Sequence, residues 1–330
     1  MERMCRLEIY NLHEDLKMSN ASGAADYTEF QSRLRELGGD QLDLARIRQC
    51  VADVTYCQIA TVTPGWRKKL QRHVIEPLEK IKLAVIVVDF QNDFVDGSLS
   101  LKAGDSGENP DDAVGPINTL LAEQEIDLVV YTFDWHPENH ISFFDHRHDE
   151  DRQLAAEERD REPALFDCVS FAKPSCKQVL YPSHCVQNSD GAKLDSRIRV
   201  VENAEMIYKG TDVLTDSYSA FFDNAKQGRT HLEEALRAKD INALLVCGLA
   251  YDICVAATLK DAAELGFLAA AVADCCKGFS QDGITKAHND FEKLSIPRMC
   301  LEDAQKVARR QAIPTEWILN LIAQAGTATD

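Results

Sequence analysis

The 330-residue sequence lacks the features that mark membrane and secreted proteins. No apolar run approaches the roughly 20 residues that a membrane-spanning helix needs. The longest candidates, Leu83 to Val88 and the alanine-rich stretch after Leu265, are much shorter. The N-terminal segment MERMCRLEIY is not followed by the apolar core of a signal peptide. We therefore expect a cytoplasmic protein with no membrane partner.

Positive charge is also scarce, because 36 Lys and Arg residues stand against 54 Asp and Glu residues, for a formal net charge of −18. Nucleic acids and anionic membranes would repel such a chain, so neither is expected as a partner. The 11 cysteines include no C-x-x-C pair, which argues against a redox enzyme and predicts mostly reduced, buried thiols. No dinucleotide-binding or P-loop glycine motif is present.

An alternation of strand and helix patterns begins at Lys82. Helical patterns separate five β-rich runs: LAVIVVD (83–89), IDLVVYTFD (126–134), AEMIYKG (204–210), ALLVCGLA (243–250) and FLAAAVAD (267–274). Runs that are apolar on both faces suit buried parallel strands. The sequence therefore predicts an α/β fold with a doubly wound, mostly parallel sheet and helices on both faces. The charged segment Asp145 to Glu162 is expected to be a solvated insertion.

Residues 1–80 differ in texture, being polar and helix-prone. The patterns EFQSRLREL and ARIRQCVADV flank a Gly38-Gly39-Asp40 break, which predicts two helices joined by a turn. This break lacks the regularly spaced carboxylates of a calcium loop. We expect a helical N-terminal extension over 1–80 and an α/β domain over 81–330. The extension is expected to pack on the domain surface or to pair subunits of a homo-oligomer.

Reactive side chains follow several of the predicted strands. In open α/β sheets, sites lie outside the carboxyl ends of the strands. Each residue type alone has an ordinary structural role at a strand end: Asp often caps a turn, Lys is often solvated, and Cys in an apolar helix is usually inert. The convergence of several such residues at one edge of the sheet favours a functional site instead. The strands deliver, in chain order, Asp89, then Asp134 and His136, then Lys209, then residues 248–250 followed by Cys254.

Cys254 is the candidate nucleophile. It stands in the first turn of a predicted helix that begins at Asp252. A helix N-terminus favours the thiolate, and a nearby Lys⁺ would favour it further. Asp89 is the natural acceptor for the thiol proton.

Asp134 and His136 are the candidate metal ligands, because a spacing of two on a strand points both side chains the same way. Carboxylate and imidazole together suit Zn²⁺, Mn²⁺ or Fe²⁺. A third ligand is needed, and four histidines are candidates: His140, His146, His148 and His184. His146 and His148 stand in the charged insertion, where a solvated role is expected. The spacing does not choose between His140 and His184.

Five segments together carry a family resemblance: DFQNDF (89–94), DWHPENHISF (134–143), YPSHCVQNSDG (181–191), KGTD with DSYSAFFDN (209–224) and GLAYDICVAATLKDAAELG (248–266). Between about Leu83 and Leu301 the chain resembles the nicotinamidase branch of the isochorismatase-like hydrolases. The resemblance implies hydrolysis of nicotinamide to nicotinic acid and ammonia in NAD salvage, through a cysteine thioester. It implies a triad of Asp89, Lys209 and Cys254, and a divalent metal, first of all zinc, on Asp134, His136 and His184.

The same resemblance implies further roles around the substrate. It implies a cis peptide before Ala250, with the N–H groups of Ala250 and Cys254 forming an oxyanion hole. Phe94 would stack on the pyridine ring. Tyr181 stands where relatives commonly carry Trp, so an aromatic ring is retained while the substrate range is open to change.

Two other functions are compatible with parts of this pattern. One is another amidohydrolase of the same superfamily, acting on isochorismate or a carbamoyl compound. The complete Asp/His/His set argues against isochorismate, whose hydrolysis needs no metal. The other is a non-catalytic member that serves as an interaction module, and the intact triad argues against it.

The metal assignment predicts different effects for two histidines. His184→Ala should lower both metal occupancy and reaction rate, because a ligand is lost, whereas His148→Ala should change neither. Elemental analysis of the purified variants checks this. Full metal occupancy in the His184 variant would mean that the third ligand is misassigned, and His140 would be the next candidate.

Overall fold

The computed structural model describes residues 20–39, 41–57, 66–159 and 161–328. The chain divides into two compact units, one formed up to Lys80 together with Gln311 onward, and one spanning Ile81–Arg310. Across the described ranges, no helix is both long enough and apolar enough to cross a membrane. Asp40, in the predicted turn between the first helices, lies outside the described residues.

The second unit is built on a six-stranded sheet in the order β6-β2-β1-β7-β8-β9. Every neighbouring pair is parallel. The strands are β1 (Leu83–Val88), β2 (Leu128–Asp134), β6 (Glu205–Lys209), β7 (Ala243–Leu249), β8 (Leu268–Lys277) and β9 (Arg298–Met299). All residues of β1, β2 and β7 are buried, as their continuous apolar runs predict. The five predicted strands are therefore confirmed.

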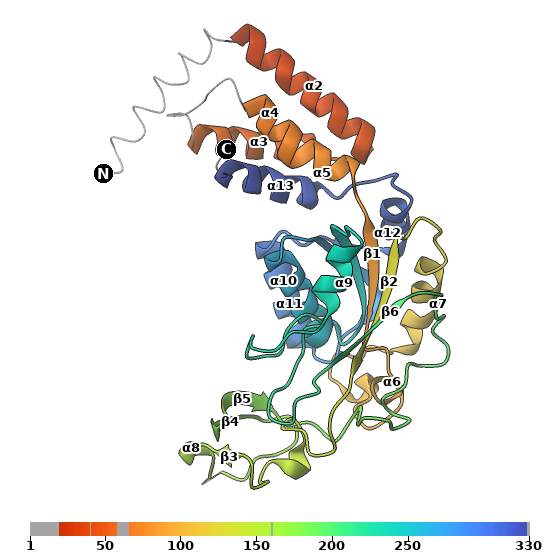
Figure 1. The fold of residues 1–330 in the computed structure, drawn as a ribbon, viewed down its shortest axis with the longest axis vertical. Coiled ribbons are helices and arrows are strands. Elements are labelled where there is room, and N and C mark those ends of the chain that lie inside the picture. Colours follow the sequence, from red (N-terminus) through yellow and green to blue (C-terminus); the bar gives the residue numbers. More distant parts are fainter. Residues whose placement is uncertain (1–19, 40, 58–65, 160, 329–330) are drawn as a thin grey trace, which may run out of the picture. The chain divides into compact units, whose positions relative to one another are not determined.

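Helices cover both sides of this sheet, which confirms the doubly wound architecture. Figure 1 shows α10 and α11 on one side and α7 with α12 on the other. The helical segments are α6 (Asn92–Val95), η3 (Leu101–Ala103), α7 (Asp111–Leu120), η4 (Phe144–His146), α8 (Ala156–Arg159), α9 (Leu232–Ala238), η5 (Tyr251–Val255), α10 (Ala256–Glu264), α11 (Gln281–Lys293) and α12 (Leu301–Ala308).

The charged insertion is more ordered than the sequence suggested. It contributes β3 (Gln153–Leu154) and α8 (Ala156–Arg159). β3 pairs with β4 (Cys168–Lys173), which in turn pairs with β5 (Ser175–Val179), and neither of these two strands was predicted. The three strands are antiparallel and lie over a small apolar cluster of Ile141, Leu154, Val169, Phe171 and Leu180. The segment is solvated as expected, since Arg152 and Leu154 are its only buried residues among those described, but it is not an irregular loop throughout. A two-residue strand with one buried side chain is too short for a periodic signal.

The first unit is helical. Its elements are α2 (Asn20–Gly38), α3 (Leu44–Cys57), α4 (Trp66–Leu70), η2 (Gln71–Ile75), α5 (Glu76–Glu79) and α13 (Thr315–Thr327). α2 and α3 match the two predicted helices, and Gly39 between them has φ +77°. α13 packs against α3 and η2, so closely that a Cβ on Gly326 would lie 2.5 Å from Val54 Cγ1. The described part of residues 311–330, assigned above to the α/β domain, thus packs with the N-terminal helices through α13.

This packing makes a prediction for truncated proteins. Removing residues 1–80 alone should lower solubility, because the α13 side chains Trp317, Ile318 and Ile322, all buried in the full chain, would lose their cover. Removing 1–80 together with 311–330 should restore solubility and leave metal content and catalytic rate unchanged. A soluble, metal-loaded double truncation with little activity would show that these helices contribute to the site.

Candidate functional site

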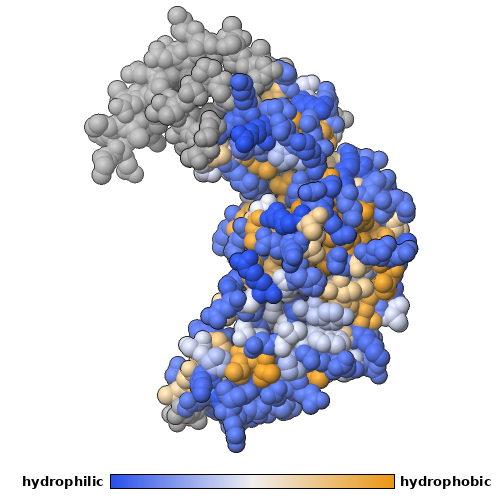
Figure 2. All heavy atoms as spheres, viewed as in Figure 1, coloured by the Kyte–Doolittle hydropathy of each residue, from blue (hydrophilic) through white to orange (hydrophobic). Residues whose placement is uncertain are grey.

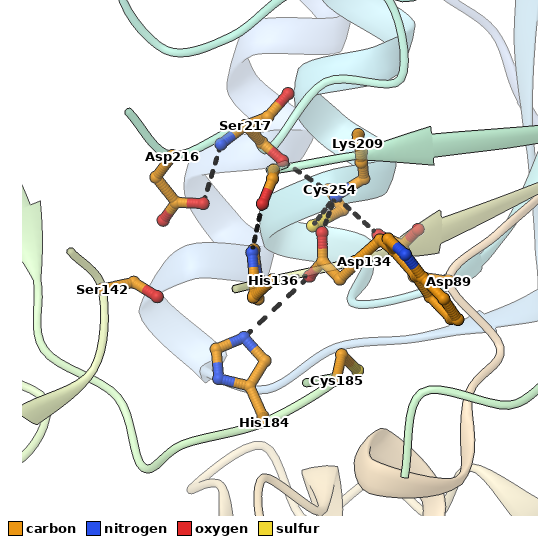
Figure 3. Close-up of polar contacts among 12 residues, drawn as sticks. Asp89, Asp134, His136, Ser142, His184, Cys185, Lys209, Asp216, Ser217 and Cys254 are labelled. Atoms are coloured by element: carbon orange, nitrogen blue, oxygen red, sulfur yellow. Dashed lines mark hydrogen bonds and ion pairs between the residues drawn. The ribbon is translucent and has the colours of Figure 1, made fainter. Parts of the chain in front are cut away.

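Four neighbouring strands bring the predicted reactive residues to one edge of the sheet, as Figure 3 shows. Asp89 follows β1 directly, while Asp134 and Lys209 end β2 and β6 and are paired in register. β7 leads through Ala250 into η5, which carries Cys254. All these side chains are buried. The predicted convergence at the carboxyl ends of the strands is therefore present.

Lys209 lies at the centre of this group. Its Nζ is 2.9 Å from Asp89 Oδ2 and 3.5 Å from Cys254 Sγ, it donates to the Ser217 carbonyl over 2.9 Å, and it contacts Asp134 Oδ1. Burial acts to lower the pKa of Lys209, but the carboxylates of Asp134 and Asp89 outweigh it and raise that pKa well above its ordinary value. The site therefore contains a permanent, fully buried ammonium.

Asp89 is held by β2 as well as by Lys209. The Thr132 hydroxyl donates to Asp89 Oδ1 over 2.6 Å, and the Asp89 N–H lies 3.2 Å from the Thr132 carbonyl. Asp89 has φ +44°, a left-handed conformation uncommon for non-glycine residues. Burial raises the pKa of Asp89 despite the opposing effect of Lys209. A carboxylate with raised proton affinity is suited to accept and return a proton.

Cys254 differs from expectation in two respects. It stands in the π-helical turn η5 rather than in the first turn of an α-helix, and α10 begins only at Ala256. Burial raises the pKa of its thiol well above the ordinary value, and the nearby Lys209 only partly opposes this. Burial and the two nearby carboxylates therefore act against the stabilisation of the thiolate that was expected from the helix N-terminus and Lys209. The raised pKa of Cys254 favours the thiol, so a base beside it would help to form the thiolate.

Asp134, His136 and His184 have ligand atoms within 4.8 Å of one another. His136 Nδ1 lies 2.8 Å from the Gly210 carbonyl and His184 Nδ1 lies 2.8 Å from the Pro182 carbonyl. A carbonyl only accepts, so each Nδ1 carries the hydrogen and each Nε2 offers its lone pair. The two Nε2 atoms lie 3.6 and 4.0 Å from Asp134 Oδ2. This donor set, with anchored imidazoles, fits a divalent metal.

The other candidate histidines have different surroundings. The His140 ring stacks on the His136 ring with centroids 4.0 Å apart, and its Nδ1 is 2.7 Å from Ser142 Oγ. His146 is partly exposed and pairs with Asp149 at 2.8 Å. His148 is exposed. Only His140 and His184, the two that spacing left open, are therefore buried beside His136.

The predicted substrate-binding residues flank the metal ligands. The rings of Phe94, in α6, and Tyr181 lie 5.6 and 5.7 Å from the His184 ring, and both side chains are buried. The cis peptide Leu249–Ala250 is present as the resemblance implied. Ala250 immediately precedes η5 and Cys254 lies within it, and both residues are buried.

Sequence reasoning missed residues that hold the site in place. The Gln91 amide donates to the Asp134 carbonyl and accepts from the Asp134 N–H, each over 2.8 Å. Gly210 has φ +63°, and a Cβ there would lie 2.4 Å from His136 Cε1. Thr132 could have been found, because it precedes Asp134 by two strand positions and so shares its face. The contact of Gln91 with Asp134 had no signal, because it depends on how the segment after β1 packs against the end of β2.

Comparison with known proteins agrees with this architecture. The isochorismatase domain model matches residues 83–303, and the chain belongs to that family of hydrolases. Among relatives, the nicotinamidase of Escherichia coli is 36% identical over 212 residues, which cover 63% of this chain and 89% of that protein.

Two solved structures extend the comparison. A nicotinamidase–pyrazinamidase from Acinetobacter baumanii is 30% identical, with 67% of this chain and 97% of that chain covered and a TM-score of 0.58. A pyrazinamidase from Pyrococcus horikoshii, solved in complex with zinc, is 28% identical, with 66% and 99% covered and a TM-score of 0.51.

Proposed function

We propose that this protein is a nicotinamidase, which hydrolyses nicotinamide to nicotinic acid and ammonia and so serves NAD salvage. The observation that carries the proposal is the position of the Lys209 ammonium. It lies 2.9 Å from Asp89 Oδ2 and 3.5 Å from the Cys254 sulfur, and it contacts Asp134, one of the three candidate metal ligands. The names of the Escherichia coli and Acinetobacter baumanii relatives support the choice of substrate. A cytosolic location stays a prediction.

The first half-reaction forms a thioester. Asp89 takes the proton from Cys254 Sγ while Lys209 stabilises the thiolate, and the sulfur attacks the carboxamide carbon. The carbonyl electron pair moves onto oxygen, where the N–H groups of Ala250 and Cys254 would stabilise it. The C–N bond then breaks as Asp89 returns the proton to nitrogen, and ammonia leaves.

The second half-reaction consumes one water. Asp89 takes a proton from the water, whose oxygen attacks the thioester carbon, and the C–S bond breaks. The departing sulfur regains a proton from Asp89, so Cys254 returns to the thiol form and nicotinic acid is released. The raised pKa of Asp89 suits this repeated acceptance and return of a proton.

Asp134, His136 and His184 would hold the divalent metal, with zinc as the proposed ion and Mn or Fe as alternatives. The zinc in the Pyrococcus horikoshii relative supports this choice. When bound, the metal supplies a Lewis acid that would hold the pyridine nitrogen. Phe94 and Tyr181, on separate segments around His184, would orient the ring by stacking.

Cys254→Ala tests the proposed nucleophile. Ammonia release from nicotinamide should fall on the order of 10³-fold or more, because no thioester can form, while metal content and the unfolding temperature stay unchanged. The exposed Cys168 offers a matched control, and Cys168→Ala should keep the full rate. Retention of a tenth of the wild-type activity by the Cys254 variant would rule out this role.

Addition of a chelator to the wild type should abolish the release of ammonia from nicotinamide.

A further inference from the structure

Phe166 is an exposed aromatic residue in a backbone conformation that rarely accommodates one. Its φ is +68°, and 45% of the residue is exposed. Bulky side chains avoid this left-handed region, so the surrounding structure must enforce it. The Phe166 N–H donates to the Leu180 carbonyl over 2.7 Å, and the Leu180 N–H donates to the Asp167 carbonyl over 3.0 Å. These two hydrogen bonds hold the segment of Phe166 against Leu180, the residue immediately before Tyr181.

The Phe166 ring begins a series of aromatic contacts that leads inward. Its centroid is 5.5 Å from that of Phe279 and 6.2 Å from that of Tyr181, whose ring in turn lies 5.7 Å from His184. Exposure falls from 45% at Phe166 to 8% at Tyr181 and 4% at His184. Figure 2 shows hydrophobic side chains on the surface beside the three-stranded sheet. The series therefore runs from solvent to the metal ligands.

Phe279 is held in place by a residue of η5, the turn that carries Cys254. The Asp252 carboxylate, two residues before Cys254, accepts from the Phe279 N–H over 2.8 Å and from the Ser280 N–H over 3.0 Å. A Cβ on Gly283 would lie 2.4 Å from that carboxylate, so glycine is required for its close approach. The turn that carries the nucleophile therefore also positions Phe279 against Phe166.

We propose that Phe166 and Phe279 form the outer wall of the substrate pocket and determine which aromatic amides reach Cys254. The two side chains come from separate segments that meet only in the folded chain, and neither lies in the motifs that carry the family resemblance. A flat ring entering toward Tyr181 meets this pair first. The pair stabilises the bound ring by aromatic contact and excludes wider ring systems. The substrate class rests on the proposed nicotinamidase function.

Phe166→Gly separates this role from a merely structural one. Glycine suits φ +68°, so the unfolding temperature should not fall. The KM for nicotinamide should rise about 2- to 10-fold, as for loss of one aromatic contact, with kcat unchanged. The ratio of kcat/KM for the bicyclic quinoline-3-carboxamide to that for nicotinamide should rise about 10-fold. Phe279→Ala, which keeps the backbone bonds to Asp252, should act in the same direction. Leu165→Ala is the matched control, since that neighbour is 44% exposed, and it should change none of these values.

A second readout does not depend on turnover. Cys254 is alkylated by the bulky iodoacetanilide and, separately, by the smaller iodoacetamide, both in a Cys168→Ser background. The ratio of the first rate to the second should be about 10-fold higher in Phe166→Gly than without that substitution. Peptide mass spectrometry measures both rates at Cys254. If the wild type releases no ammonia but Phe166→Gly still raises the alkylation ratio, the proposed substrate is contradicted while the role of Phe166 in controlling access is supported. The proposed role of Phe166 would be contradicted if the wild type is active and the Phe166→Gly variant has the same KM, selectivity and alkylation ratio as Leu165→Ala.

Discussion

One buried ammonium, that of Lys209, holds the site together. Two carboxylates out of water beside each other would repel, and leaving such charges unpaired typically costs about 3–5 kcal/mol. The single positive charge of Lys209 lies between them, in contact with Asp89 Oδ2 and Asp134 Oδ1, and so offsets one of the two negative charges and reduces their repulsion. The other oxygen of Asp134 faces His136 and His184. Asp134 therefore joins the proton-transfer half of the site to the metal-binding half, and the Lys209 ammonium makes this sharing electrostatically acceptable.

The parallel sheet makes this arrangement possible. Lys209 and Asp134 are register partners on adjacent strands, and β1 lies on the other side of β2, so Asp89 reaches the same ammonium. Thr132 and Gln91 then fix the two carboxylate-bearing segments by hydrogen bonds. The next strand, β7, leads into the turn that carries Cys254, and burial raises the pKa of this thiol. In the proposed mechanism, proton transfer to Asp89 therefore forms the thiolate.

The sequence predicted what depends on local pattern. Continuous apolar runs located the five longest strands of the main sheet, and the rule that sites follow strand ends brought Asp89, Asp134, Lys209 and Cys254 together. The choice of His184 as third ligand came from family resemblance, because spacing left His140 open. The π-helical turn at Cys254, the small antiparallel sheet and the packing of α13 on α3 were not predicted. Each depends on contacts between distant segments, which leave no periodic signal in the chain.

The central claim is that the Lys209 ammonium is what turns these residues into a nicotinamide-hydrolysing site. The most direct test is the rate of ammonia release from nicotinamide by metal-loaded, folded Lys209→Met protein, compared with the wild type. Methionine has similar length and no charge. The account predicts measurable release by the wild type and a fall on the order of 10²- to 10³-fold or more in the variant, as for loss of a preorganised charge in a buried site. A folded Lys209→Met protein that releases ammonia at the wild-type rate would contradict it.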